Sequence, residues 1–137
     1  LLAASHSDSG ADMSWTESRW GPEDEIGAAN RLTPELAKAA IDLGFYLSMS
    51  GIATFPKSQE VRDIFAAAPV DRILVETDSP YLAPKPFRGK RNEPAYTVHT
   101  AKVGAELFGM DYPSFAAQTQ ENFDRLFAKA AKYKDAA

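Results

Sequence analysis

The sequence predicts an α/β fold with a parallel sheet, and two observations support this prediction. Two short apolar runs, residues 45–49 and 72–76, each follow a segment whose apolar residues recur at helical spacing. The second run contains Ile73-Leu74-Val75 with no polar residue between them, which is typical of a strand buried on both faces. Strands that alternate with helices pair in parallel through crossover connections.

Capping and helix-ending residues mark the two helices that precede these strands. Thr33 is suited to cap the first helix, Pro34 to its first position, and Gly44 to the left-handed residue that follows it. The second helix is expected to end at Pro69. Its predicted buried face consists of Val61, Ile64, Phe65 and Ala68.

A proline-rich loop, residues 79–93, separates the second strand from two C-terminal helices. The first of these helices is expected over residues 94–108, and the second follows Asp111, which is a good N-cap. The second helix carries aromatic residues that we expect to face the core, namely Phe115, Phe123 and Phe127. We expect Asn122 to bind backbone groups rather than a substrate.

Composition limits the class of protein. The 137 residues suit one domain, and the net charge of −4 argues against general adhesion of the molecule to nucleic acid. No cysteine is present, which excludes a disulfide framework and thiolate metal ligands, and no apolar run is long enough to span a membrane. We therefore expect a cytoplasmic protein with an irregular segment over residues 1–33, an α/β region over residues 34–131 and a tail over residues 132–137.

An acidic residue at the end of the second strand, next to a basic loop, suits a metal ion and a phosphate. Asp78 follows the strand, and Glu76 lies two residues earlier. The loop carries four cationic side chains that suit contact with phosphate oxygens, namely Lys85, Arg88, Lys90 and Arg91. The alternatives are that Asp78 caps the turn at Ser79-Pro80, that Glu76 is structural, and that the basic loop is merely solvated.

Several stretches occur in the order found in one enzyme family. They are Leu43-Gly44-Phe45-Tyr46, Ser50-Gly51-Ile52, Asp71-Arg72, Glu76-Thr77-Asp78-Ser79-Pro80-Tyr81-Leu82, Arg88-Gly89-Lys90-Arg91-Asn92-Glu93-Pro94 and Asn122-Phe123 with Arg125-Leu126-Phe127. Residues 35–127 thereby resemble the final third of the TatD-type metal-dependent deoxyribonucleases. The resemblance implies a TIM-type barrel with residues 45–49 and 72–76 as its last two strands. Because such a barrel takes about 250 residues, we expect one copy of this chain to form a partial barrel.

The resemblance also implies hydrolysis of DNA by water that a divalent metal ion (Mg, Mn or Zn) activates. Asp78 would be a metal ligand that helps to deprotonate the water, Glu76 would support it, and Arg88, Lys90 and Arg91 would contact phosphate. The family's His-x-His pair, its central Glu and its later histidines have no counterpart in this sequence. We therefore expect this chain alone to have little or no nuclease activity.

Residues 19–34 resemble a different family. The stretch Arg19-Trp20-Gly21-Pro22-Glu23-Asp24-Glu25-Ile26-Gly27 and the residues through Pro34 are similar to the entry segment of the putative cyclases, the kynurenine-formamidase-like metal hydrolases. The simplest interpretation is a chimera joined near residues 33–35. Two alternatives stay open: a non-catalytic α/β module that self-associates through open sheet edges, and a cyclase relative whose tail was replaced.

Overall fold

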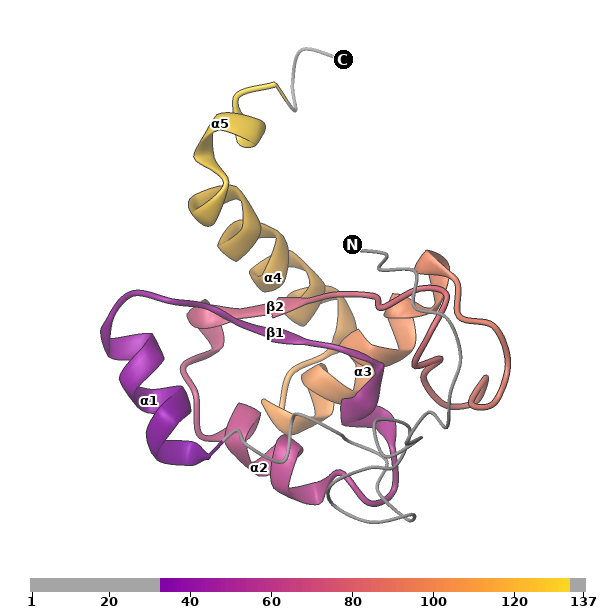
Figure 1. Cartoon of the computed structure of the whole chain (residues 1–137). Coiled ribbons are helices and arrows are strands. Elements are labelled where there is room, and N and C mark those ends of the chain that lie inside the picture. The colour runs from indigo at the N-terminus through magenta and orange to yellow at the C-terminus, as the bar shows by residue number, and fades with distance from the viewer. Residues whose placement is uncertain (1–32, 134–137) are drawn as a thin grey trace, which may run out of the picture.

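Two short parallel strands lie side by side at the centre of the computed structural model, which describes residues 33–133 (Figure 1). Strands β1 (Leu47–Met49) and β2 (Ile73–Val75) pair with Leu47 opposite Ile73 and Met49 opposite Val75. Helix α2 (Gln59–Ala66) lies in the crossover between them. The predicted α/β class and the parallel pairing are therefore confirmed.

Helix α1 (Pro34–Asp42) has the predicted start and end. The Thr33 hydroxyl accepts a hydrogen bond from the Leu36 N–H at 3.2 Å, and Gly44 has a φ of 91°. The N–H groups of Gly44 and Phe45 donate to the carbonyls of Ile41 and Ala40 and close a Schellman motif. This motif corrects the predicted strand over residues 45–49, because Phe45 belongs to the exit from the helix and the strand begins at Leu47.

The second strand is also shorter than predicted. A 3₁₀ turn, η4 (Val70–Arg72), precedes it and takes Arg72 out of the strand. The strand ends at Val75, although the Glu76 N–H still donates to the Met49 carbonyl at 2.9 Å. Ile73 is buried, whereas Leu74 and Val75 are only half-buried. Of the three strand residues only Ile73 is fully buried among the described residues, so the predicted burial of the whole strand on both faces is wrong for this part of the chain.

The core lies between the covered face of the sheet and helices α2, α3 (Thr97–Leu107) and α4 (Tyr112–Leu126). It contains Met49, Ala53, Val61, Phe65, Ala68, Ile73, Ala101, Ala105 and Phe115. Helices α3 and α4 approach closely at Gly104, where an added Cβ atom would collide with the Phe115 ring. The predicted helix over residues 94–108 begins with a separate 3₁₀ turn, η5 (Pro94–Tyr96).

Asn122 on α4 is fully buried and ties this helix to strand β2. Its amide nitrogen donates to the carbonyls of Val70 at 2.8 Å and Ile73 at 2.7 Å, and its amide oxygen accepts from Gln118 at 3.0 Å. The predicted role in binding backbone groups is confirmed. At the start of the same helix, the Ser114 N–H donates to the Asp111 carboxylate at 2.7 Å and lowers the pKa of that carboxyl group.

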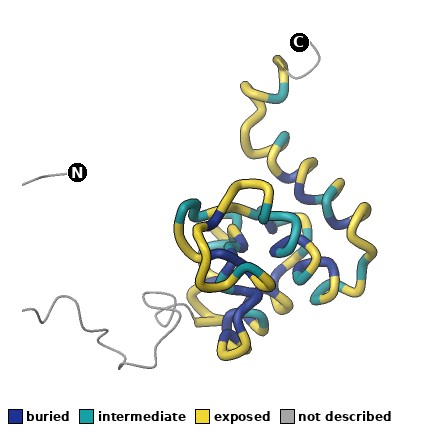
Figure 2. Tube along the Cα trace, turned by 90° about the vertical axis from the view of Figure 1, so that its right-hand side faces the viewer, coloured by how far each residue is buried: buried dark blue, intermediate teal, exposed yellow. Residues whose placement is uncertain are grey.

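The end of α4 extends beyond the body of the molecule (Figure 1). Phe115 faces the core as predicted, but Phe123 and Phe127 are 43% and 46% exposed, so the expectation that they face the core is wrong. The helix stops at Leu126, and a short helix α5 (Ala128–Ala131) follows. Exposed residues dominate this end of the chain (Figure 2), because no other described segment covers it.

The remaining short element is a 3₁₀ turn, η3 (Gly51–Thr54), directly after β1. The predicted likeness of residues 19–34 to the cyclases lies outside the described residues, apart from Thr33 and Pro34 at the start of α1. Within residues 33–133, every helix is too short or too polar to cross a membrane.

We predict that Asn122→Ala lowers the free energy of unfolding by about 2–4 kcal/mol, because two carbonyls in the protein interior lose their donor. Urea unfolding followed by circular dichroism measures this change. Gln120→Ala, on the exposed side of the same helix, is the control and should change stability by less than about 0.5 kcal/mol. Equal stability of the two variants would contradict the role of Asn122.

Candidate functional site

Asp78 lies in a tight turn just after strand β2. The Tyr81 N–H donates to the Asp78 carbonyl at 2.8 Å, and the Thr77 hydroxyl accepts from the Ser79 N–H at 3.3 Å and contacts the Ser79 hydroxyl at 2.7 Å. The Asp78 side chain is half-buried and makes no hydrogen bond with any described residue. The alternative that Asp78 caps this turn is therefore wrong, since the hydroxyl of Thr77 and the backbone hold it.

Glu76 is exposed and follows the last residue of the strand. We expect Glu76 to point the same way as Asp78 on the condition that the strand continues to residue 78. The strand ends at Val75, so this condition is not met. The supporting role of Glu76 stays a prediction.

The basic loop is closed onto this turn by Asn92, which is 4% exposed. The Asn92 side-chain amide donates to the Tyr81 carbonyl at 2.7 Å and the Thr77 hydroxyl at 3.3 Å, and its backbone N–H donates to the Pro80 carbonyl at 3.0 Å. Thr77 and Asn92 are hydrogen-bonded to each other. Asp78 directly follows Thr77 in the sequence, and Arg91 directly precedes Asn92. The two residues are thus brought together although 13 positions separate them in the sequence.

A second set of contacts fixes the middle of the loop to η3. The Thr54 hydroxyl donates to the Gly51 carbonyl at 2.7 Å and accepts from the Lys85 N–H at 3.0 Å. Gly51 is required here, because a Cβ atom on it would collide with the Leu82 carbonyl oxygen. The Phe87 ring stacks on Tyr96 with centroids 4.0 Å apart and meets His99 edge-on at 5.3 Å. The loop is therefore held at several points along its length.

The predicted phosphate-binding side chains are exposed on this fixed loop. Arg88, Lys90 and Arg91 all reach solvent, and the Arg88 guanidinium lies 4.5 Å from the centroid of the Phe55 ring. A guanidinium that stacks on an aromatic face still presents its N–H groups at its edge. Arg88 and Lys90 line one groove, which does not include Asp78, Glu76 or Arg91, and the roles of all five residues stay predictions.

The donor set does not fit a complete metal site. Within residues 33–133, no three His, Cys, Asp or Glu side chains are grouped so that they would hold a metal ion. The single carboxylate of Asp78 would bind a hard cation only weakly. Glu76 is close in the sequence but exposed. An ion at Asp78 would need further ligands from outside these residues.

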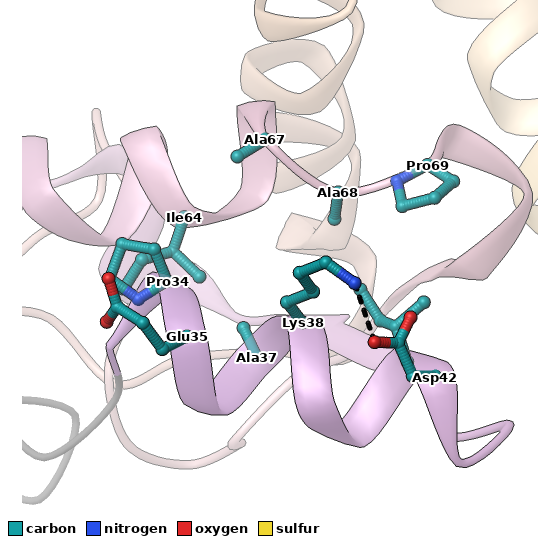
Figure 3. A pocket seen from close by; sticks show the side chains of 10 residues that line it. Pro34, Glu35, Ala37, Lys38, Asp42, Ile64, Ala67, Ala68 and Pro69 are labelled. Carbon is teal, nitrogen blue, oxygen red and sulfur yellow. Dashed lines mark hydrogen bonds and ion pairs between the residues drawn. The ribbon is translucent and has the colours of Figure 1, made fainter.

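A separate pocket of about 390 Å³ lies between α1 and the α2–Pro69 segment (Figure 3). Its charged groups are Glu35 and the pair Lys38–Asp42, whose Nζ and Oδ2 atoms are 2.6 Å apart. The other lining residues are apolar, and none of the predicted site residues lies there. The pocket therefore presents no arrangement suited to phosphate or metal chemistry.

The sequence pattern alone does not single out Thr77, Asn92 or Thr54 as residues that organise the site. Their hydrogen-bond partners lie up to 31 positions away in the sequence, as for Thr54 and Lys85. A pattern within a short stretch of sequence therefore cannot indicate these contacts. The one available signal is that Thr77 and Asn92 both fall inside the stretches that carry the family resemblance.

Comparison with known proteins identifies a single family. The TatD related DNase family matches residues 31–128. The chain is 50% identical over 93 residues to the uncharacterized metal-dependent hydrolase YcfH of Escherichia coli K12, a match that covers 68% of this chain and 35% of YcfH. It is 44% identical over 93 residues to the uncharacterized metal-dependent hydrolase YabD of Bacillus subtilis, covering 68% of this chain and 36% of YabD. The chain thus spans about a third of the length of these relatives.

Solved structures support the fold. The crystal structure of YJJV, a TatD homolog from Escherichia coli K12, superposes with a TM-score of 0.65 at 27% identity, over 71% of this chain and 38% of that one. A TatD family hydrolase from Entamoeba histolytica gives a TM-score of 0.60 at 18% identity, over 68% of this chain and 38% of that one. The α/β arrangement of this chain is therefore that of part of a TIM-type barrel.

We predict that Asn92→Ala loosens the loop that carries the basic residues. The variant loses the donors to Tyr81 and Thr77, which should lower the free energy of unfolding by about 1–3 kcal/mol. Hydrogen exchange should become faster in residues 77–92 and stay unchanged in α3. Lys90→Ala on the same loop is the control, and unchanged exchange in Asn92→Ala would contradict the proposed anchoring.

Proposed function

Because the chain belongs to the TatD family of metal-dependent hydrolases, we propose that the whole protein hydrolyses phosphodiester bonds, with DNA as its substrate. The observation that carries this proposal is the hydrogen bond between Thr77 and Asn92, whose neighbours along the chain are Asp78 and Arg91. It supports a site in which a carboxylate suited to a divalent cation and cations suited to phosphate act together.

The residues have separate roles in this proposal. Asp78 supplies one oxygen ligand to a divalent ion, Glu76 supports it, and Arg88, Lys90 and Arg91 bind phosphate oxygens of the substrate. When bound, the metal would supply a water molecule of lowered pKa. Since the described residues lack a full ligand set, we propose that residues 33–133 provide no nuclease activity by themselves. The absence of cysteine suits a reducing compartment, so we place the protein in the cytoplasm.

The role of Asp78 can be tested without an activity assay. We predict that Mn²⁺ broadens the amide signals of residues 77, 78, 79 and 81 in NMR spectra of the chain, because a paramagnetic ion at the carboxylate relaxes nearby nuclei. Asp78→Asn should abolish the effect, whereas Glu106→Gln, an exposed carboxylate on α3, should leave it unchanged. Broadening that is absent, or that survives in Asp78→Asn, would contradict the ligand role.

The same variants test the activity assigned to this chain. End-labelled single-stranded DNA incubated with the chain and Mg²⁺ or Mn²⁺ should be cleaved no faster than without metal. Strong metal-stimulated cleavage that disappears in Asp78→Asn would show that one chain is a sufficient enzyme and would overturn the expectation of inactivity.

We also propose that the chain self-associates, with another copy covering the exposed end of α4. The face carries Phe123, Leu126 and Phe127, each at least 43% exposed. The same region has a hollow of about 180 Å³ next to Leu74 and another of about 250 Å³ next to Tyr133. One surface that offers both protruding rings and hollows is suited to a twofold-symmetric contact, in which each copy supplies both.

We predict that sedimentation velocity detects a concentration-dependent dimer, and that Phe123→Ser with Phe127→Ser shifts the chain toward monomer, because the apolar contact area is lost. Leu43→Ser is the control, since Leu43 is 78% exposed at the end of α1. A compact monomer at every concentration, or an equal effect of the control, would contradict association through α4.

A further inference from the structure

An open groove of about 740 Å³ lies between Phe55, the residue after η3, and the basic loop. Its lining residues are Phe55, Pro80, Tyr81, Leu82, Ala83, Arg88, Gly89 and Lys90. Two of these residues are cationic and none is acidic, in a chain whose net charge is −4. The groove therefore carries positive charge in a molecule whose net charge is negative, which suits an anionic ligand.

Tyr81 is the exposed aromatic residue of this groove. Its side chain is 74% exposed, although its backbone is held on both sides, with the N–H bound to the Asp78 carbonyl and the carbonyl bound to the Asn92 amide. Tyrosine has few rotatable bonds, so a ring on such a fixed backbone loses little conformational entropy when another ring stacks on it.

Leu82, the residue after Tyr81, has a strained backbone conformation. Leu82 has a φ of 54°, in the left-handed region that residues with a Cβ atom rarely adopt. Leu82 packs against Gly51, whose missing side chain leaves room for the Leu82 carbonyl. Backbone strain of this kind is found where the surrounding structure fixes a functional segment.

Phe55 and Arg88 also line the groove. The Phe55 carbonyl accepts a hydrogen bond from the Arg62 guanidinium at 2.6 Å, which fixes the backbone beneath the ring. The Arg88 guanidinium stacks over that ring. Lys90 follows after Gly89, whose φ of 82° turns the chain between the two cationic residues. The groove is thus lined by an exposed aromatic ring, Tyr81, and by two cationic side chains.

We infer that Tyr81 stacks on an unpaired nucleobase of a strand whose phosphates contact Arg88 and Lys90. The inference rests on the proposed function, since it takes the substrate to be a nucleic acid. An exposed ring next to a cationic groove is the combination that binds single strands, because every base offers a face for stacking and every linkage an anionic charge. A paired base in a duplex is already stacked and cannot use Tyr81.

The test measures binding of the 137-residue chain to a fluorescent oligothymidylate by anisotropy, with EDTA present so that hydrolysis plays no part. Tyr81→Ser should weaken binding by about tenfold, and Tyr81→Phe should bind as the unmodified chain does. Tyr133→Ser is the matched control, because Tyr133 is 75% exposed but lies after α5. Circular dichroism checks that all variants are equally folded.

Two further probes separate stacking from contact with phosphate. An abasic strand of the same length should bind the chain and Tyr81→Ser equally, whereas Lys90→Gln should weaken binding of both strands and reduce its dependence on salt. Binding of oligothymidylate that Tyr81→Ser leaves unchanged would overturn the role of Tyr81 alone. Failure of the chain to bind the oligothymidylate, the abasic strand or a duplex would overturn it together with the proposed nucleic-acid substrate.

Discussion

The buried amide of Asn122 is the interaction on which the rest of this structure depends. Its two N–H groups satisfy the carbonyls of Val70 and Ile73, one just before and one at the start of strand β2. A two-stranded sheet is marginal by itself and needs a packed layer to persist. Asn122 fixes α4 against β2, so that Phe115 and α3 can complete the layer over the covered face. The position of β2 then determines where the turn at Asp78 begins.

The second constraint is the closure of the loop after β2. Asn92 bonds to Thr77 and Tyr81, while Thr54 and Gly51 hold the middle of the loop against η3. These hydrogen bonds hold the loop against its neighbours. The side chains of Tyr81, Arg88, Lys90 and Arg91 remain exposed to solvent. A carboxylate, several cations and a tyrosine ring thus lie on one segment that is hydrogen-bonded at several points.

The unpaired outer edges of the described two-stranded sheet and the exposed end of α4 have one common cause. The described residues correspond to part of a TIM-type barrel, and some of their apolar surface is left exposed. The cost of that exposure favours association with other polypeptide. Within α4, burial extends from Phe115 to Asn122, and the last residues of the helix are exposed.

The sequence by itself determined the features that depend on near neighbours along the chain. Thr33, Pro34 and Gly44 set the ends of α1, Asp111 caps α4, and apolar spacing marks the buried face of α2, because these effects act within one or two helical turns. Only the tertiary structure shows that Phe123 and Phe127 are exposed, that Thr77 rather than Asp78 holds the turn, and that Asn92 bonds to Thr77 from 15 positions away. Burial and long-range hydrogen bonds depend on which distant segments meet, and periodicity carries no information about whether a partner covers a given face.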